Sequence, residues 1–229
     1  MAAEENLVFD LVVHLGTIFA VCAYFRKELW RIIVSMTIGK AKRGEQENAL
    51  RKLGFLLLLG TVPAAIAGIL LTDYVEDIFD VTLVGAALVA NGVLLFAAER
   101  FGSKGTKKSA GALDALIIGT FQAISIMPGI SRSGSTLSGG MFRGLERETA
   151  AVFAFLLSVP ILLAAFAYAV VTLDTFDLDL VASLIGAGAA FVTGVVSIGY
   201  LLKAVRAGKL WIFSVYCLIL GAAVLVLTL

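Results

Sequence analysis

One polar stretch decides how this chain is interpreted: Pro128-Gly129-Ile130-Ser131-Arg132-Ser133-Gly134-Ser135-Thr136. It places an arginine, four hydroxyl side chains and two glycines within nine residues, between segments that are largely apolar. Such polar groups in an apolar, membrane-like surrounding are costly and usually mark a functional site. Pro-Gly is expected to end one helix, and Ser131 to cap the next, whose first free N–H groups attract anions. Because Arg132 adds a forked cation, the stretch predicts a phosphate-binding loop.

The composition indicates an integral membrane protein. Of the 229 residues, 60% are hydrophobic and only 15% are charged, and the mean hydropathy is +0.99. A water-soluble domain of this length needs more charge to cover its surface. Cys22 and Cys217 lie in apolar segments and are interpreted as small core residues. A single histidine without neighbouring cysteines argues against a zinc or iron site.

Six apolar segments are long enough to cross a bilayer, which takes about 20 helical residues. Their unbroken hydrophobicity favours helices over strands, so the predicted fold class is all-α. Asn91, a polar residue in the third segment, is interpreted as a contact between helices. The six predicted spans are 7–25, 53–71, 81–98, 149–171, 180–202 and 210–228.

The loops between these spans alternate in charge. Basic residues gather after the first, third and fifth spans, whereas the loops after the second and fourth spans are acidic. Basic loops favour the cytoplasmic side, which predicts a multi-pass protein of the cell membrane with both chain ends outside. Segment 112–142 has basic residues on both sides, at Lys107, Lys108, Arg143 and Arg147. It is therefore expected to enter the membrane and return as a re-entrant helix pair.

The order of segments predicts an internal repeat within a single membrane domain, 1–229. Three spans, the re-entrant pair and three more spans follow one another along the chain. Residues 112–229 form a complete unit, and residues 1–100 form a unit that lacks its first re-entrant pair. A unit with an odd number of crossings repeats in inverted orientation, as in many transporters. The prediction is thus an inverted repeat with the first hairpin missing.

Four segments carry a resemblance to a known family. The run Gln122-Ala123-Ile124-Ser125-Ile126-Met127, continuing through Pro128 to Thr136, resembles the second signature of the undecaprenyl pyrophosphate phosphatases, the bacitracin-resistance membrane family. Three further stretches are similar to that family: Phe9-Asp10-Leu11-Val12-Val13-His14-Leu15-Gly16-Thr17, Thr61-Val62-Pro63-Ala64-Ala65, and Arg147-Glu148-Thr149-Ala150-Ala151 through Leu157-Ser158-Val159-Pro160. The resemblance extends over nearly the whole chain.

The resemblance implies an activity and its site residues. Family members remove the terminal phosphate from undecaprenyl (polyprenyl) diphosphate, regenerating the lipid carrier for cell-envelope glycans and giving bacitracin resistance. The site is expected to open to the outer face, with Mg²⁺ or Ca²⁺ assisting, and a homodimer is left open. Arg132, Ser131 and Ser133 are the implied catalytic residues. The implied substrate-binding residues are Gly129, Gly134, Thr136 and Gln122.

The family's first signature, a pair of acids followed by Pro-x-Ser-Ser-x-Gly-His, is expected before Glu4 and is absent from the sequence. Asp10 and His14 stand four residues apart on one helix face and are candidate acid and base groups. The sequence favours the simpler interpretations, a hydrogen-bonded interior pair or a solvent-facing helix end.

Alternatives also remain for the loop and for the function. Arg132 could pair with a carboxylate, and the Thr136 hydroxyl could bond to the preceding helical turn. A non-catalytic polyprenyl-phosphate binder or transporter, or a degenerate structural paralogue, are the alternative functions. A nucleic-acid role is excluded, because the basic residues are not interleaved with aromatic ones.

Overall fold

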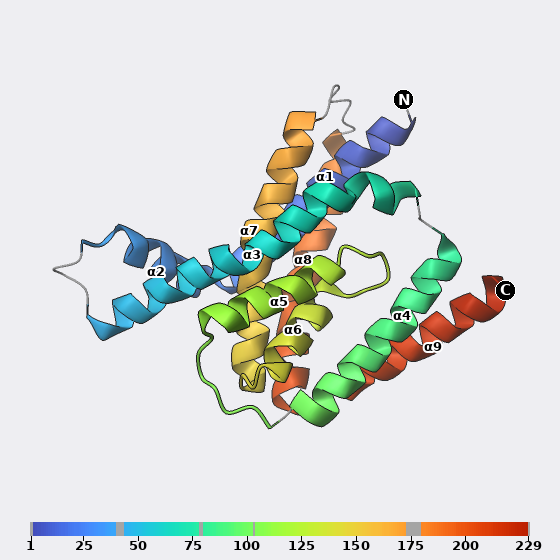
Figure 1. Cartoon of the computed structure of the whole chain (residues 1–229). Coiled ribbons are helices and arrows are strands. Elements are labelled where there is room, and N and C mark those ends of the chain that lie inside the picture. Colours follow the sequence, from blue (N-terminus) through green and yellow to red (C-terminus); the bar gives the residue numbers. More distant parts are fainter. Residues whose placement is uncertain (1, 40–43, 78–79, 103, 173–179, 229) are drawn as a thin grey trace. The chain divides into compact units, whose positions relative to one another are not determined.

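The computed structural model of the chain consists of helices joined by loops (Figure 1). It describes residues 2–39, 44–77, 80–102, 104–172 and 180–228. No β-strand occurs within these ranges, so the all-α prediction is confirmed. The helices are α1 (Ala2–Tyr24), α2 (Arg26–Thr37), α3 (Glu45–Asp77), α4 (Val81–Ala97), the π-helical turn η2 (Ala98–Gly102), α5 (Ala112–Ile124), α6 (Arg132–Phe142), α7 (Arg147–Thr172), α8 (Leu180–Arg206) and α9 (Trp211–Thr228).

Five helices are long and apolar enough to cross a membrane, which confirms a polytopic protein. These candidate spans are Glu45–Leu71, Val81–Gly102, Arg147–Thr172, Leu180–Arg206 and Trp211–Thr228. They match the second to sixth predicted spans. The first predicted span falls in α1, whose apolar part with described side chains is Leu11–Tyr24. The prolines at positions 63 and 160 lie inside α3 and α7, as the sequence predicted.

The chain divides into two compact units that do not follow chain order. Unit 1 comprises Met1–Arg51 and Ser158–Leu201, and unit 2 comprises Lys52–Leu157 and Leu202–Leu229. The inverted repeat of 1–100 and 112–229 is a different division of the chain and stays a prediction. All of the polar loop, residues 128–136, lies in unit 2.

Unit 1 is held together by close contacts between small residues. A Cβ on Gly194 of α8 would lie 2.8 Å from the Cβ of Ala20 in α1, so the two helices approach closely at this point. The basic segment after α1, predicted only as a loop, forms the amphipathic helix α2. Trp30 and Ile33 are exposed on this helix, whereas Ile32 and Ser35 are buried.

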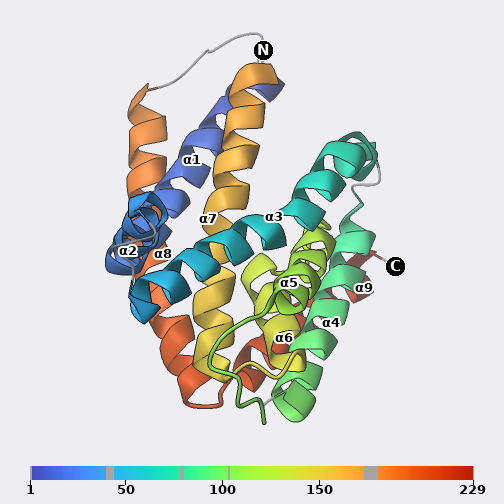
Figure 2. The same ribbon diagram turned by 60° about the vertical axis from the view of Figure 1, so that its left-hand side comes forward.

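In unit 2, α4 and α9 pack side by side and antiparallel (Figure 1), and a second view shows the same pair (Figure 2). Glycines permit this close packing: a Cβ on Gly92 would lie 2.7 Å from the Cγ of Leu218. The Ser214 hydroxyl of α9 donates a hydrogen bond of 2.7 Å to the carbonyl of Gly92. The polar loop packs against α4 of this pair.

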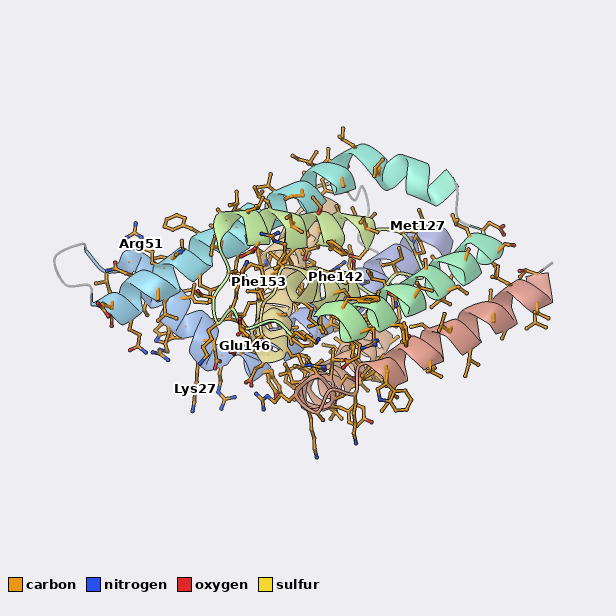
Figure 3. All side chains as sticks on the ribbon, turned by 60° about the horizontal axis from the view of Figure 1, so that its bottom comes forward. Lys27, Arg51, Met127, Phe142, Glu146 and Phe153 are labelled. Atoms are coloured by element: carbon orange, nitrogen blue, oxygen red, sulfur yellow. The ribbon has the colours of Figure 1, made fainter. Side chains whose placement is uncertain are left out.

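Helices α5 and α6 form the helical hairpin that the sequence predicted over 112–142. They contain 13 and 11 residues, which gives lengths of about 20 and 16 Å, less than the roughly 30 Å of hydrocarbon in a bilayer. The Ser135 hydroxyl of α6 donates to the Phe121 carbonyl of α5 at 2.7 Å and ties the two helices together. Figure 3 shows Met127 at the turn of the hairpin and Glu146 at the other end.

We expect Gly119→Ala to destabilise unit 2. A methyl group at this position would meet the Gly60 carbonyl of α3, and Pro63 Cδ at 3.1 Å. Alanine improves helix propensity by up to about 1 kcal/mol, but overpacking against backbone costs about 1–3 kcal/mol and outweighs it. Thermal unfolding in detergent should show a Tm lower by about 3–8 °C. The matched control is Thr120→Ala on the exposed side of α5, which should change Tm by less than about 2 °C; equal changes would contradict the packing argument.

Candidate functional site

The turn of the hairpin is shaped by Gly129. Helix α5 ends at Ile124, and the N–H groups of the next three residues return to carbonyls of its last turn. Gly129 has φ 95°, a left-handed conformation that favours glycine. A Cβ there would lie 2.7 Å from the Val84 carbonyl and 2.9 Å from the Ala87 Cβ. Glycine is therefore required for the turn to pack against α4.

Ser131 is the N-cap of α6, as the sequence predicted. Its Oγ accepts a hydrogen bond of 3.2 Å from the Gly134 N–H and lies 3.4 Å from the Ser133 Oγ. Ser131 is exposed, and Ser133 is partly exposed. The N–H groups of Arg132 and Ser133 belong to the first turn of α6, where a helix has no acceptor of its own. Two hydroxyls and two N–H groups thus gather at one helix end.

Arg132 is half-buried at the first position of α6. Among the described residues, no carboxylate forms an ion pair with it. This differs from Arg143 and Arg147 of the same unit, which pair with Asp114 and Glu99 at 2.8 and 2.6 Å. The alternative in which Arg132 serves an internal carboxylate gains no support from the described part of the chain. As far as the described residues go, the guanidinium is available for an external anion.

Thr136 and Ser135 turn their hydroxyls toward the protein. Thr136 is 1% exposed, and its Oγ1 donates to the carbonyls of Arg132 at 2.8 Å and Ser133 at 3.3 Å. This is the bond to the preceding turn that the sequence left open as an alternative. Because the Thr136 hydroxyl already donates its proton to these carbonyls, it does not donate to a substrate in this structure. Substrate contact by Thr136 stays a prediction.

Gln122 lies in the last turn of α5, just before the polar loop. Its side chain is 2% exposed, and neither its oxygen nor its nitrogen has a hydrogen-bond partner among the residues that the structure describes. Leaving a buried polar group unsatisfied costs about 1–3 kcal/mol, so such groups call for an explanation. A ligand bound at the loop would provide one.

Asn91 of α4 contacts the polar loop, and the sequence did not predict this contact. The predicted contact between helices is confirmed, because its Nδ2 donates to the Cys217 Sγ of α9 at 3.3 Å. Its Oδ1 also accepts the N–H of Ser131 at 3.2 Å. The only signal in the sequence was an amide within an apolar span, since the partner lies 40 residues away.

The other end of the hairpin carries a compact charge cluster around the buried Asp114, in the first turn of α5 and outside the five candidate spans. Its carboxylate accepts from Arg143 Nε at 2.8 Å, Lys107 Nζ at 3.4 Å and the Gly111 N–H at 3.0 Å. Burial acts to raise the pKa of Asp114, but these three donors outweigh it and hold the pKa below its ordinary value. The cluster is internally satisfied and offers no anion site.

The candidate acid and base groups lie in unit 1. His14 is exposed, and its carbonyl accepts the Thr17 hydroxyl at 2.7 Å. The side chain of Asp10 lies outside the described residues. Their action at the loop stays a prediction.

The described residues contain no group of three or more histidine, cysteine, aspartate or glutamate side chains that could hold a metal ion. Residues 125–136 contain hydroxyls but no carboxylate, whereas Mg²⁺ and Ca²⁺ favour carboxylate oxygens. The loop by itself does not fit a protein-held divalent cation.

Comparison with known proteins gives a consistent picture. The family model for Bacitracin resistance protein BacA matches residues 1–223. An undecaprenyl-diphosphatase of Idiomarina loihiensis is 36% identical over 98% of this chain and 85% of its own length. One from Anaeromyxobacter dehalogenans is 41% identical over 96% of this chain and 77% of its own length. One from Korarchaeum cryptofilum is 35% identical over 98% and 86%, respectively.

We expect Asp114→Asn to destabilise the hairpin and remove part of its acid sensitivity. The Asp114 carboxylate has a lowered pKa, so its contribution to stability is present above about pH 4 and is lost as the pH falls through the lower folded-state pKa. Asparagine keeps the cap but loses the charge, which should cost about 1–2 kcal/mol at pH 7.

Thermal unfolding between pH 3 and pH 8 tests this expectation. The control is Glu148→Gln, which removes an exposed ion pair with Arg206 and should change Tm little. An Asp114→Asn variant with the wild-type Tm at pH 7 and the wild-type pH dependence would contradict the role of the cluster.

Proposed function

The chain belongs to the bacitracin resistance protein BacA family, and from this membership we propose that it is an undecaprenyl-diphosphatase whose site is the loop from Gly129 to Thr136. It hydrolyses undecaprenyl diphosphate to the monophosphate and inorganic phosphate in the membrane. The monophosphate is the lipid carrier for cell-envelope glycans, and its regeneration explains a link to bacitracin resistance. The five candidate spans agree with a lipid substrate.

The observation that carries the assignment to this loop is the half-buried Arg132 at the N-terminus of α6, without a carboxylate among the described residues. Burying an arginine without a counter-charge is unfavourable, so the arrangement is stabilised by an anion. A helix N-terminus adds about half a positive charge. A diphosphate supplies the negative charge and the oxygen acceptors that both groups require.

The loop residues can divide the work of phosphoryl transfer. Arg132 would neutralise charge on the transferring phosphoryl group, and the N–H groups and hydroxyls of Ser131 and Ser133 would donate to its oxygens. In a direct route, the oxygen of water bonds to the terminal phosphorus and gives up its proton to a base. In a covalent route, a serine Oγ bonds to that phosphorus first, and water then displaces the serine from it and releases inorganic phosphate. The bond from that phosphorus to the bridging oxygen breaks, and the bridging oxygen leaves with the lipid monophosphate.

The remaining parts of the proposal concern proton transfer, the cation and the membrane. Asp10 and His14 are proposed as the acid and base groups, without a placement beside the loop. A divalent cation, Mg²⁺ or Ca²⁺, would be held mainly by the diphosphate oxygens, because the loop has no carboxylate, and no step above depends on it. The alternation of loop charges supports an outward-facing site with both chain ends outside. A homodimer stays a prediction.

We expect Arg132→Ala to abolish phosphate release. Loss of a cation that stabilises the transferring phosphoryl group should lower kcat/KM for undecaprenyl diphosphate by at least about 100-fold, and Arg132→Lys should recover only a small part, since lysine lacks the fork. Phosphate release is measured in detergent on the purified chain.

The matched control is Arg206→Ala, which removes an exposed arginine of the same unit that pairs with Glu148 and should keep activity within about twofold. Wild-type turnover in Arg132→Ala would contradict the site. Tight binding of the diphosphate by the wild type without any turnover would instead indicate the binder or transporter.

We expect Gln122→Met to separate stability from substrate binding. Methionine has a similar size and removes a buried amide that has no partner among the described residues, so Tm should stay equal or rise by a few degrees. The same change should raise KM about tenfold if the amide contacts bound substrate. Both quantities are measured on the same preparation. A lower Tm with an unchanged KM would show that the amide serves the fold instead.

A further inference from the structure

We propose that Asn91 is a positioning residue that holds the loop of Gly129–Thr136 in the conformation that binds the diphosphate. This inference rests on the proposed function, because the groups that Asn91 orients are the loop donors proposed to bind the diphosphate. It concerns unit 2 alone, which contains Asn91, the loop and α9.

The amide of Asn91 has a defined orientation. Its side chain is buried, with 1% of the residue exposed. A backbone N–H can only donate, so the amide oxygen must face Ser131, at 3.2 Å. The amide nitrogen then faces the Cys217 sulfur, at 3.3 Å. One side chain therefore links α4, α9 and the N-cap residue of α6.

The sequence of the loop explains why it needs an acceptor from another helix. In a capping box, the side chain at the third helical position accepts the N–H of the N-cap residue. In α6 that position is Gly134, which has no side chain. A Cβ there would already lie 3.1 Å from Leu95 Cδ2 and 3.2 Å from Ser131 Cβ, so a glutamate would require these neighbours to shift. Asn91 supplies the missing half of the box.

A second contact on the same face of α4 fixes the other side of the turn. Gly129 packs against Val84 and Ala87, which lie on the helix face that Asn91 continues one turn later. The turn is thus held on both sides of Ile130. Because α6 starts at Arg132, the direction of its first N–H groups follows from these contacts with α4.

Because of this arrangement, we expect replacement of Asn91 to affect catalysis more than stability. Positioning matters because displacing a donor by a fraction of an ångström weakens its interaction with the transferring phosphoryl group. Asn91→Leu keeps a side chain of similar size but leaves the Ser131 N–H without an acceptor. We expect kcat/KM for undecaprenyl diphosphate to fall by about five- to tenfold, the effect of weakening one hydrogen bond.

Ser214→Ala is the matched control. It removes a buried hydrogen bond between α9 and the Gly92 carbonyl, one residue from Asn91, and does not touch the loop. Both variants should lower Tm, because each loses a buried hydrogen bond between α4 and α9, and Asn91→Leu also loses the bond to Ser131. Only Asn91→Leu should lower kcat/KM, and Ser214→Ala should stay within about twofold. Parallel losses of Tm and kcat/KM in the two variants would overturn the proposal, as would wild-type kcat/KM in Asn91→Leu.

Hydrogen–deuterium exchange of the wild-type chain gives a test that needs no variant. The Ser131 N–H should exchange slowly in overlapping peptides that cover the loop, because it is bonded to a buried amide; rapid exchange would overturn the proposal even if Asn91→Leu fails to fold. The same readout separates the two proposals. A protected Ser131 N–H in a chain that neither binds nor hydrolyses the diphosphate would sustain the geometry and refute the proposed function.

Discussion

The loop depends on a constraint that apolar surroundings impose: every polar group must find a partner or serve a ligand. The N-cap of α6 meets this constraint with Ser131 Oγ for the Gly134 N–H and Asn91 Oδ1 for the Ser131 N–H. Thr136 and Ser135 meet it with backbone carbonyls. Within the part of the chain that the structure describes, the guanidinium of Arg132 has no carboxylate partner and the amide of Gln122 has no hydrogen-bond partner. These groups define the chemistry of a ligand: acceptor-rich and negatively charged.

The two ends of the hairpin use similar residues for opposite purposes. At the end where α5 begins, Arg143 and Lys107 share the carboxylate of Asp114, so the charges are balanced within the protein. At the turn, the described residues leave Arg132 without such a carboxylate. The balanced cluster fixes the base of the hairpin, whereas the cation at the turn, unpaired among the described residues, is the group that we propose binds the diphosphate. Both groups belong to the same hairpin of α5 and α6.

Gly129 of the loop and Asn91 of α4 allow the loop to contact α4 closely. Gly129 lets the turn approach the backbone at Val84, and Asn91 gives the loop an acceptor where Gly134 has no side chain. The helix therefore works as a template for the loop as well as a candidate span. Such support from neighbouring residues is what keeps a phosphoryl-transfer site in register with its substrate, since catalysis by electrostatic stabilisation requires donors that are already oriented.

The sequence by itself determined the membrane class, the candidate spans in α3, α4, α7, α8 and α9, the helical hairpin and the Ser131 cap. Each of these follows from hydropathy, from the charges of the flanking loops or from residues within one turn. It did not predict α2, where the charges of a basic segment hid a helical periodicity. Only the tertiary structure decided that Asn91 reaches Ser131 and Cys217, 40 and 126 residues away. The same holds for Gln122, whose burial without a described partner depends on packing. Local patterns specify helices and caps, but the partner of a polar group depends on which distant residues the fold brings within about 3 Å.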